Sequence, residues 1–435
     1  MPYETEVVIL GAGLTGLSAA YHLKQEYELF EKEQEAGGLC RSVCRDGFTF
    51  DFTGHLLHFH DNRIRNLIEA IGHIFWVSHQ RKASIHTHKT YLPYPFQAHL
   101  SGLPQKVICE CLLELLRTHQ QSPTSQPPEN FKDWVVRNFG QGIARHFLLP
   151  YNQKMWRIDP AEMTFDWALS MIPVPNLEEV VKGCFNQNEQ EYGYNQTFYY
   201  PAEGGIEVLG KSFLPSINRV RTGMEAVRIE TRKKAVWFQD GESIGYQQLI
   251  SSIPLPELVR IISDAPAQIK SLAENLRSTS VFCLNLGVAR EKVSDQHWIY
   301  FPESEYPFYR VGFPTNFSSG VAPSGSSSLY VEISHLPGEQ IDPDRMLKLT
   351  LSKLIDCGLL RESDLVISHS FLDIPCAYVT FDSHRQKSLP VIRQYLQTQD
   401  IHSVGRYGGW EYSSMGQALV AGMETARTVN ALVAA

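Results

Sequence analysis

Three glycines near the N-terminus have the spacing of a turn that can hold a pyrophosphate. They are Gly11, Gly13 and Gly16, and they follow directly after the apolar run Val7–Leu10. In a strand–turn–helix unit, the first glycine permits the tight bend, the second lets the backbone approach a pyrophosphate, and the third lets the helix pack closely on the strand. The helix N-terminus then offers free N–H groups and a partial positive charge to the phosphates. Glu31, about twenty residues further on, can accept a hydrogen bond from a ribose hydroxyl.

The residues around these glycines supply the elements that such a turn needs. The run Val7–Leu10 favours a strand, Leu17–Lys24 favours a helix, and a second β-favouring stretch ends at Phe30. A G-x-G-x-x-G pattern without this context would be weak evidence, but with the strand before it and the acid after it we predict a dinucleotide-binding βαβ unit. This unit alone does not tell NAD from FAD.

A second pair of glycines, Gly37 and Gly38, stands just before Leu39. Adjacent glycines can let the backbone pass close to a flat ring or a phosphate. The alternating segment 48–53 that follows predicts a strand, which ends at the loop Gly54–His55. We therefore expect a second stretch of backbone to lie against the dinucleotide.

The bulk composition excludes several classes of protein. The chain has 435 residues, enough for two or three interlocked domains, and its 43% hydrophobic and 20% charged residues are ordinary for a globular protein. A net charge of −8 argues against a nucleic-acid partner. No apolar run approaches the length of a membrane span, and the N-terminus has no signal-like region. The eight cysteines form no C-x-x-C pair, so we expect reduced thiols and a cytoplasmic protein.

Periodicity along the rest of the chain predicts regions of different structure. Helical spacing at 104–118 and 131–147 predicts a mainly helical insertion. Strand-like pieces predict an antiparallel sheet, at 282–288, 298–301, 308–313 and 328–334. We therefore predict an α/β fold with three parts: a Rossmann-like domain formed by 1–90, 200–265 and 395–435, a helical insertion at 91–190, and a substrate-side sheet formed by 191–200 and 266–394.

The N-terminal pattern as a whole resembles a known group of flavoproteins. The G-x-G-x-x-G unit, Glu31, the G-G-L at 37–39 and the strand ending near Gly54–His55 resemble the FAD-binding half of proteins related to amine oxidases, protoporphyrinogen oxidase and UDP-galactopyranose mutase. The resemblance implies FAD rather than NAD, and a cofactor domain of the GR2 type that is assembled from the start, middle and end of the chain.

Longer motifs make the resemblance narrower. They cover nearly the whole chain in order and are similar to the larger, eukaryotic-type branch of the UDP-galactopyranose mutase family: YLPYPFQ (91–97), FLLPYNQKMW (147–156), PNLEEVV (175–181), GYNQTFYYPAEGG (193–205), WIYFPESEYPFYR (298–310) and GRYGGWEY (405–412). The P-F-Y-R and P-Y-P-F-Q blocks are far more specific than the glycine fingerprint.

The resemblance implies a set of cofactor-binding residues. It places the backbone of Val227 at the adenine, Arg406 near the FAD pyrophosphate and Gln417 near the flavin. The full set is Gly11, Gly13, Gly16, Glu31, Lys32, Gly38, Leu39, Val227, Arg406 and Gln417. NAD(P)H is the expected reductant of the flavin.

The same resemblance implies a site for a small nucleotide-sugar, expected to be UDP-linked. Flat rings can stack on or wall a uracil, amides can match its edge, and tyrosine hydroxyls with an arginine can donate to a diphosphate. Asn195 could contact a sugar hydroxyl or a phosphate. The implied residues are Gln97, Phe147, Tyr151, Asn152, Trp156, Asn195, Tyr300, Arg310, Tyr378 and Tyr412.

The family chemistry implies interconversion of the pyranose and furanose forms of a UDP-sugar, with N5 of reduced flavin as nucleophile. Arg310 would stabilise the leaving diphosphate, and His55, beside the flavin, would adjust the seat or protonation of the reduced ring. Packing and a structural ion pair are the alternatives for the single aromatic residues and for Arg310. His58 and His60 share the loop of His55, but without a carboxylate pattern they are weak evidence for a metal, and we predict none.

Departures from the family pattern leave other functions open. The position of a second family arginine is Met171, which cannot bind a phosphate, and the loss of one charge-assisted contact costs roughly 1.5–3 kcal/mol. A family tyrosine that faces the diphosphate is replaced by Phe317, and the segment after Tyr412 is shorter. We therefore also consider a flavin oxidoreductase of the amine oxidase or protoporphyrinogen oxidase type, and a non-catalytic nucleotide-sugar-binding flavoprotein.

Overall fold

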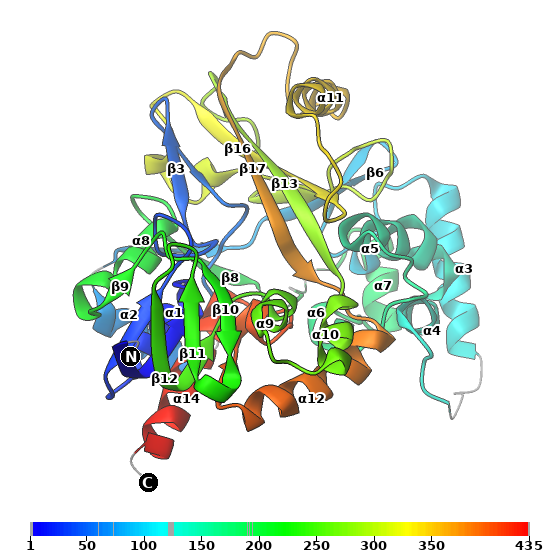
Figure 1. Cartoon of the computed structure of the whole chain (residues 1–435). Coiled ribbons are helices and arrows are strands. Elements are labelled where there is room, and N and C mark those ends of the chain that lie inside the picture. Colours follow the sequence, from blue (N-terminus) through cyan, green and yellow to red (C-terminus); the bar gives the residue numbers. More distant parts are fainter. Residues whose placement is uncertain are drawn as a thin grey trace.

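A computed structural model describes residues 3–59, 61–72, 74–120, 126–188, 190, 192–193 and 195–433. His60 lies outside the described residues. Two seven-stranded sheets form the framework, with helices packed on and between them (Figure 1). Among the described residues, no helix is both long and apolar enough to cross a membrane.

The first sheet is built around β1 (Tyr3–Leu10), which pairs in parallel with β2 (Tyr27–Phe30) and β12 (Ser243–Ser251). Parallel strands covered on both faces read as continuous apolar runs, which is why Val7–Leu10 shows no alternation. The remaining strands are β9 (Val220–Arg221), β10 (Ala226–Glu230), β11 (Ala235–Phe238) and β18 (Ile401–Ser403). The strand, turn and helix predicted at the N-terminus are confirmed, with α1 at Leu14–His22.

The last helix, α14 (Met415–Val433), packs on α1, so the two ends of the chain share one layer (Figure 1). The helices approach backbone to backbone, because a Cβ at Gly422 would lie 2.2 Å from the carbonyl oxygen of Thr15. The hydroxyl of Ser18 also donates to the carbonyl oxygen of Leu419 at 2.6 Å. This packing brings the N-terminus of α14 to the same edge of the sheet as the glycine turn.

The second sheet has the order β17-β13-β16-β15-β14-β6-β7, and its pairs are antiparallel except β14 with β6. Its strands are β6 (Ala83–Thr87), β7 (Thr90–Pro93), β13 (Ser278–Val288), β14 (Trp298–Tyr300), β15 (Arg310–Gly312), β16 (Ser327–His335) and β17 (Val366–Val379). The four strand-like pieces predicted for this sheet correspond to β13, β14, β15 and β16.

A group of helices lies at one side of this sheet and contributes one wall of the functional site (Figure 1). They are α3 (Gln105–Gln120), α4 (Phe131–Ile143), a π-helical segment (Ala144–Leu148), α5 (Leu149–Trp156), α6 (Ala168–Met171) and α7 (Leu177–Cys184). The other main elements are β3 (Ser42–Arg45), β4 (Phe48–Asp51), α2 (Asn62–Ile71), β5 (Trp76–Gln80), β8 (Thr197–Pro201), α8 (Glu207–Lys211), α9 (Leu255–Ile261), α10 (Ala267–Glu274), α11 (Pro343–Asp356), α12 (Ser383–Thr398) and α13 (Gly405–Gly408).

Strand pairing differs from the sequence-based division at two places. Residues 83–90 were assigned to the cofactor domain, but β6 pairs with β14 of the second sheet. Residues 191–200 were assigned to the second sheet, but β8 pairs with β5 in a separate ribbon. Both pairings join segments more than a hundred residues apart, which local periodicity does not encode. The domain boundaries themselves stay a prediction.

Candidate functional site

One cleft of about 2060 Å³ runs from the glycine turn after β1, past the loop after β4, to α5 and the β14–β15 hairpin. Pockets for a single small ligand usually measure about 300–1,000 Å³. The cleft is therefore large enough for a dinucleotide and a second ligand side by side.

At one end, glycines form a cradle without side chains. Gly13 is the N-cap of α1 and no side chain caps the helix, so its first N–H groups face the cleft. Gly38 has φ +60, and a Cβ there would lie 3.0 Å from Cα of Gly13. A Cβ at Gly16 would lie 1.9 Å from the carbonyl oxygen of Gly11, so only glycine lets α1 start so close to the turn. This is an anion site suited to a pyrophosphate.

Of the other cofactor residues predicted in this part of the chain, Glu31, Lys32 and Leu39 line the cleft, whereas Val227 does not. The carboxylate of Glu31 lines the cleft and accepts from the backbone N–H of Ala12 at 2.7 Å and of Glu33 at 3.0 Å. Lys32 and Leu39 also line the cleft. The lining extends to Met224–Ala226 but does not include Val227, whose side chain is 43% exposed. A β-bulge between Ala226 and Arg228 shifts the register there, so the segment just before Val227 is the better candidate for the adenine contact.

Arg406, on α13, is a cation in the cleft that forms no ion pair with an acid among the described residues. Its guanidinium donates to the carbonyl oxygens of Ser413 at 2.8 Å and Ala377 at 2.9 Å, and it lies over the rings of Tyr378 and Tyr412. Among the described residues, no carboxylate forms an ion pair with it. An unpaired guanidinium in a partly buried place is suited to an anionic ligand.

Gln417 lines the cleft, but its side chain already has a structural role. Its Oε1 accepts from the backbone N–H of Ser414 at 2.8 Å, while the Ser414 hydroxyl accepts from the backbone N–H of Gln417. This reciprocal pair caps the N-terminus of α14. The side-chain amide NH₂ of Gln417 is what remains to contact a flavin.

His55 presents an unsatisfied nitrogen in the cleft. Its Nδ1 is buried and has no hydrogen-bond partner in the part of the chain that the structure describes. Burial, with the nearby Arg406 guanidinium, lowers the pKa of His55 to about 4. The preceding residue pair is constrained, because Thr53 has φ +68 and a Cβ on Gly54 would lie 2.4 Å from the hydroxyl oxygen of Tyr330. The orphaned nitrogen, the glycine cradle and the unpaired Arg406 together fit a flavin dinucleotide.

A pH titration should find His55 neutral throughout the physiological range. Since its pKa is lowered from the usual value of about 6.5, its contribution to stability is complete above that pH and is lost as the pH falls towards 4. The measurement is NMR of isotope-labelled histidine, with the His55 resonance identified by its loss in His55→Asn. A His55 midpoint at or above 6.5 would contradict the buried, neutral assignment.

Arg310 lines the cleft and is held by an internal ion pair. Its Nε and Nη2 donate to the two carboxylate oxygens of Glu332 at 2.5 and 2.7 Å, and Glu332 is fully buried. The pair faces across β15 and β16, which align Arg310 with Glu332. Arg310 therefore does form the structural ion pair that was the alternative to a ligand contact. The arginine of this pair nevertheless lines the cleft. A guanidinium has more donors than these two bonds use, so the remaining ones can meet an anion.

Tyrosines from distant segments gather around Arg310 and Arg406. Those that line the cleft are Tyr94, Tyr151, Tyr300, Tyr309, Tyr330, Tyr378, Tyr407 and Tyr412. The hydroxyls of Tyr309 and Tyr378 lie 3.3 Å apart. Burial raises the pKa of Tyr300 and of Tyr378, so both keep their proton at neutral pH and can donate to an anion. The structure thus brings together the predicted Tyr300, Tyr378 and Tyr412.

The remaining predicted substrate residues all line the cleft but differ in what they can still bind. Gln97 donates to the carbonyl oxygen of Pro173 at 2.7 Å, while its Oε1 is buried without a partner and is free for a ligand donor. Asn152 uses both ends of its side-chain amide locally: it donates to the carbonyl oxygen of Leu148 and accepts from the indole N–H of Trp156. Asn195 accepts a hydrogen bond from Arg81.

Of the three aromatic residues predicted to contact the uracil, Phe147 and Trp156 are mainly packed in the protein core. The ring of Phe147 stacks between Phe96 and Tyr151, with centroids 5.3 Å from each, so Tyr151 carries the outer ring of this stack. Trp156 is almost completely buried and packs edge-on against Tyr378. These contacts make Tyr151 the best placed ring for a flat ligand.

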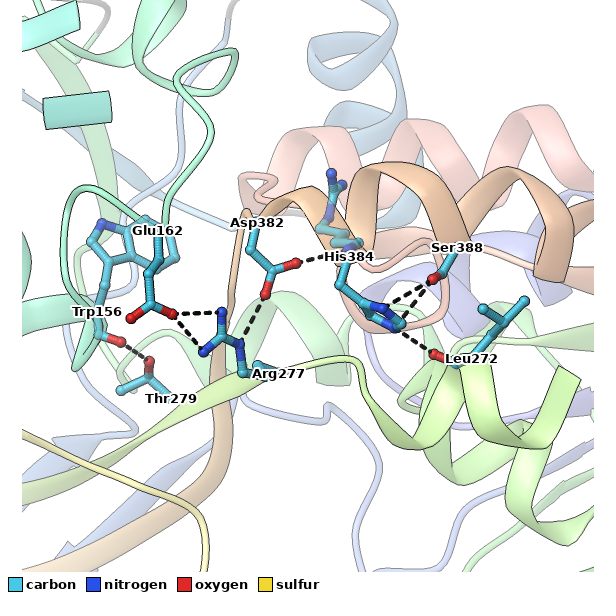
Figure 2. A network of polar contacts seen from close by, with 9 residues as sticks. Trp156, Glu162, Leu272, Arg277, Thr279, Asp382, His384 and Ser388 are labelled. Carbon is cyan, nitrogen blue, oxygen red and sulfur yellow. Dashed lines mark hydrogen bonds and ion pairs between the residues drawn. The ribbon is translucent and has the colours of Figure 1, made fainter. Parts of the chain in front are cut away.

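Figure 2 shows how Trp156 and the helices beside it are anchored to the second sheet. The carbonyl oxygen of Trp156 accepts from the Thr279 hydroxyl at 2.8 Å. Nearby, Arg277 joins Glu162 at 3.2 Å to Asp382 at 2.9 Å. Since Asp382 also caps α12, this network ties the helical wall of the cleft to two other elements.

The two residues that depart from the family pattern, Met171 and Phe317, lie in different surroundings. Met171 lines the cleft, so a methionine does stand where a cation could reach the ligand. Phe317 does not face the cleft; it is buried against Phe198 and Tyr200, so its proposed place at the diphosphate is wrong. The 3-10 turn Pro314–Asn316 directs its side chain into the core. Among the described residues, no group of His, Cys, Asp and Glu is arranged to hold a metal ion.

The sequence-based site omitted several residues that the structure places in or beside the cleft. Tyr94, Tyr309 and Tyr407 lie within motifs already singled out, so their hydroxyls could have been included. Tyr330 and Glu332 lie on β16, all of whose residues are buried, and nothing local distinguishes them from core residues. Only the pairing of β16 with β15 puts them beside Arg310.

A family model described as "Flavin containing amine oxidoreductase" matches residues 14–430, so the chain belongs to that family. Within it, the chain is a divergent relative of UDP-galactopyranose mutase. Its structure superimposes on the crystal structure of reduced UDP-galactopyranose mutase with a TM-score of 0.93, 28% identity, and coverage of 99% of this chain and 95% of that one. The predicted resemblance and α/β fold class are thereby confirmed.

Two further proteins are similar to this chain to a smaller extent, one in its fold and one over part of its sequence. A putative protoporphyrinogen oxidase from Exiguobacterium sp. 255-15 superimposes with a TM-score of 0.77 at 17% identity, covering 98% of this chain and 99% of that one, which shows the fold alone. Mitochondrial protoporphyrinogen oxidase of Nicotiana tabacum is 28% identical over 160 residues. That alignment spans 33% of this chain and 31% of the tobacco protein.

Proposed function

We propose that this flavoprotein interconverts the pyranose and furanose forms of a UDP-sugar. The observation that carries the proposal is the continuity of the cleft: the glycine cradle, His55, Arg310 and the tyrosines line one space. The similarity to reduced UDP-galactopyranose mutase over almost the whole chain supports the choice of ligand. FAD, reduced by NAD(P)H, would supply the nucleophile for the anomeric carbon of the sugar.

The residues that line the cleft would hold both FAD and the UDP-sugar, whose UDP is the leaving group. Gly13, Gly38 and the N-terminus of α1 would hold the FAD pyrophosphate, and His55 would meet the flavin with its free Nδ1. Arg310 and the neutral hydroxyls of Tyr300 and Tyr378 would donate to the UDP diphosphate as its negative charge grows. Tyr151 would cover the uracil, and the free Oε1 of Gln97 would accept from its edge.

A flavin oxidoreductase is the second candidate, and the family match favours keeping it. The test is to incubate the reduced holoprotein with UDP-galactopyranose or UDP-galactofuranose and to separate the nucleotide products by chromatography. We expect conversion between the two sugars. Peroxide formed from an amine or alcohol without such conversion would identify an oxidase, and UDP binding without any turnover would identify a non-catalytic binding protein. The cytoplasmic location stays a proposal.

Met171→Arg should raise the affinity for UDP by roughly tenfold or more. One charge-assisted hydrogen bond contributes about 1.5–3 kcal/mol, and Met171 lines the cleft at the end of α6. Affinity is measured by calorimetry. Leu169→Arg, on the exposed face of the same helix, is the matched control and should leave it unchanged. Mutase activity that appears only in Met171→Arg would show that the natural protein uses another sugar or reaction.

A further inference from the structure

Lys154, on α5, is bound by the backbone of one distant segment. Its ammonium donates to the carbonyl oxygens of Phe301 at 2.8 Å, Tyr306 at 3.0 Å and Phe308 at 3.3 Å, and to that of Glu303. No carboxylate of the described residues forms an ion pair with it. Burial lowers the pKa of Lys154 to about 7, while the nearby Glu303 and Glu305 act in the opposite direction. An ammonium only donates, so in the charged form this ring of carbonyl oxygens replaces the water that the partly buried group has lost.

The segment that receives these bonds, 301–308, connects two strands of the substrate wall. It begins directly after Tyr300 at the end of β14 and ends directly before Tyr309 and Arg310 at the start of β15. On its other side, the Glu303 carboxylate accepts from the hydroxyl of Thr87 at 2.6 Å and from a backbone N–H of the same hairpin. The segment is therefore held between α5 and the β6–β7 hairpin.

The helix that carries Lys154 is itself fixed to the sheet. The hydroxyl of Ser334 donates to the carbonyl oxygen of Met155 at 2.9 Å. The hydroxyl of Thr279 donates to the carbonyl oxygen of Trp156 at 2.8 Å, as Figure 2 shows. Tyr151, one turn before Lys154, meets Tyr300 edge-on with ring centroids 5.4 Å apart. The ammonium thus connects α5 to the segment between Tyr300 and Arg310, and both α5 and the two ends of that segment contribute residues to the cleft.

We propose that Lys154 is a positioning residue, whose ammonium holds segment 301–308 so that Tyr300 stays against Tyr151 and Arg310 stays turned to the cleft. We call this contact between the Lys154 ammonium and the carbonyl oxygens of 301–308 the clamp, and the evidence for it is the set of hydrogen bonds given above. Its ligand, a UDP-sugar, rests on the proposed function. Loss of the ammonium should loosen the segment and weaken ligand binding without removing any group that touches the ligand.

The clamp is tested first by hydrogen exchange on the holoprotein. In Lys154→Met, which keeps the apolar stem, the amides of 299–312 should exchange at least about tenfold faster than in the wild type. Lys182→Met replaces an exposed lysine on α7 that pairs with Glu178; it is the matched control and should leave the exchange of this segment unchanged. Unchanged exchange in Lys154→Met would overturn the proposal.

Its effect on the site is tested by UDP binding and chemical rescue. Lys154→Met should bind UDP at least about tenfold more weakly, with the FAD content unchanged. In Lys154→Ala, added ethylammonium should restore both UDP affinity and slow exchange, whereas propanol, which fills the space without charge, should not. Full UDP affinity in Lys154→Met would overturn the positioning role. If the wild type itself fails to bind UDP, the proposed function fails, while the amine-dependent recovery of slow exchange would still establish the clamp.

Discussion

Arg310→Lys is expected to weaken UDP binding by about one to two orders of magnitude. The variant keeps the positive charge beside Glu332 but loses the planar guanidinium. In the wild type this group bonds both carboxylate oxygens and has further N–H donors for the ligand. The loss corresponds to one charge-assisted contact of about 1.5–3 kcal/mol. The measurement is calorimetric titration of the holoprotein with UDP. Mutase turnover should fall at least as much, because the leaving diphosphate gains charge in the transition state.

Lysine is the informative replacement because Arg310→Ala would leave Glu332 charged and fully buried. Breaking a buried pair in this way typically costs about 3–5 kcal/mol of stability and would obscure the effect on binding. Arg290→Lys is the matched control, since Arg290 pairs with the nearly buried Asp364 outside the cleft. It should lower the melting temperature to a similar degree and leave UDP affinity unchanged. Equal UDP affinities of Arg310→Lys and the wild type would remove Arg310 from the site.

Gly13→Val is expected to yield a folded protein that binds FAD more than about a hundredfold more weakly. Gly13 has extended backbone angles that valine can adopt, and the nearest atom to a Cβ there is 3.8 Å away. The side chain would instead project into the cradle and keep the phosphates from the N–H groups of α1. Losing two charge-assisted hydrogen bonds of about 1.5–3 kcal/mol each accounts for this magnitude. Flavin absorbance of the purified protein and FAD titration of the stripped protein measure it.

The third glycine of the same motif separates cofactor loss from misfolding. A Cβ at Gly16 would lie 1.9 Å from the Gly11 carbonyl oxygen, so Gly16→Ala should lower the melting temperature as well as FAD content. Gly13→Val should keep its far-ultraviolet circular dichroism and the melting temperature of the wild-type apoprotein. Full FAD occupancy in Gly13→Val would contradict the assignment of this turn as the pyrophosphate site.

Elements with a strong local pattern could be predicted. The buried run of β1, the glycine turn and α1 agree with the sequence, as do β4 and the strands β13 to β16. By contrast, β17 and α12 were not recognised. The burial of β17 is irregular along its length, and α12 contains Pro390, which normally argues against a helix interior. β17 is held by its pairing with β13, a contact that local preference does not encode.

The sequence by itself determined the chemistry that is local in the chain: a glycine turn for a pyrophosphate, a flavoprotein resemblance, and tyrosines and an arginine in recognisable motifs. Only the tertiary structure decided which of these groups face one another. It paired Arg310 with Glu332, joined Arg406 to backbone carbonyl oxygens, put Phe317 in the core and joined Lys154 to segment 301–308. The physical reason is that spacing encodes backbone geometry over a few residues, whereas partners for buried charges are set by strand pairing across the chain.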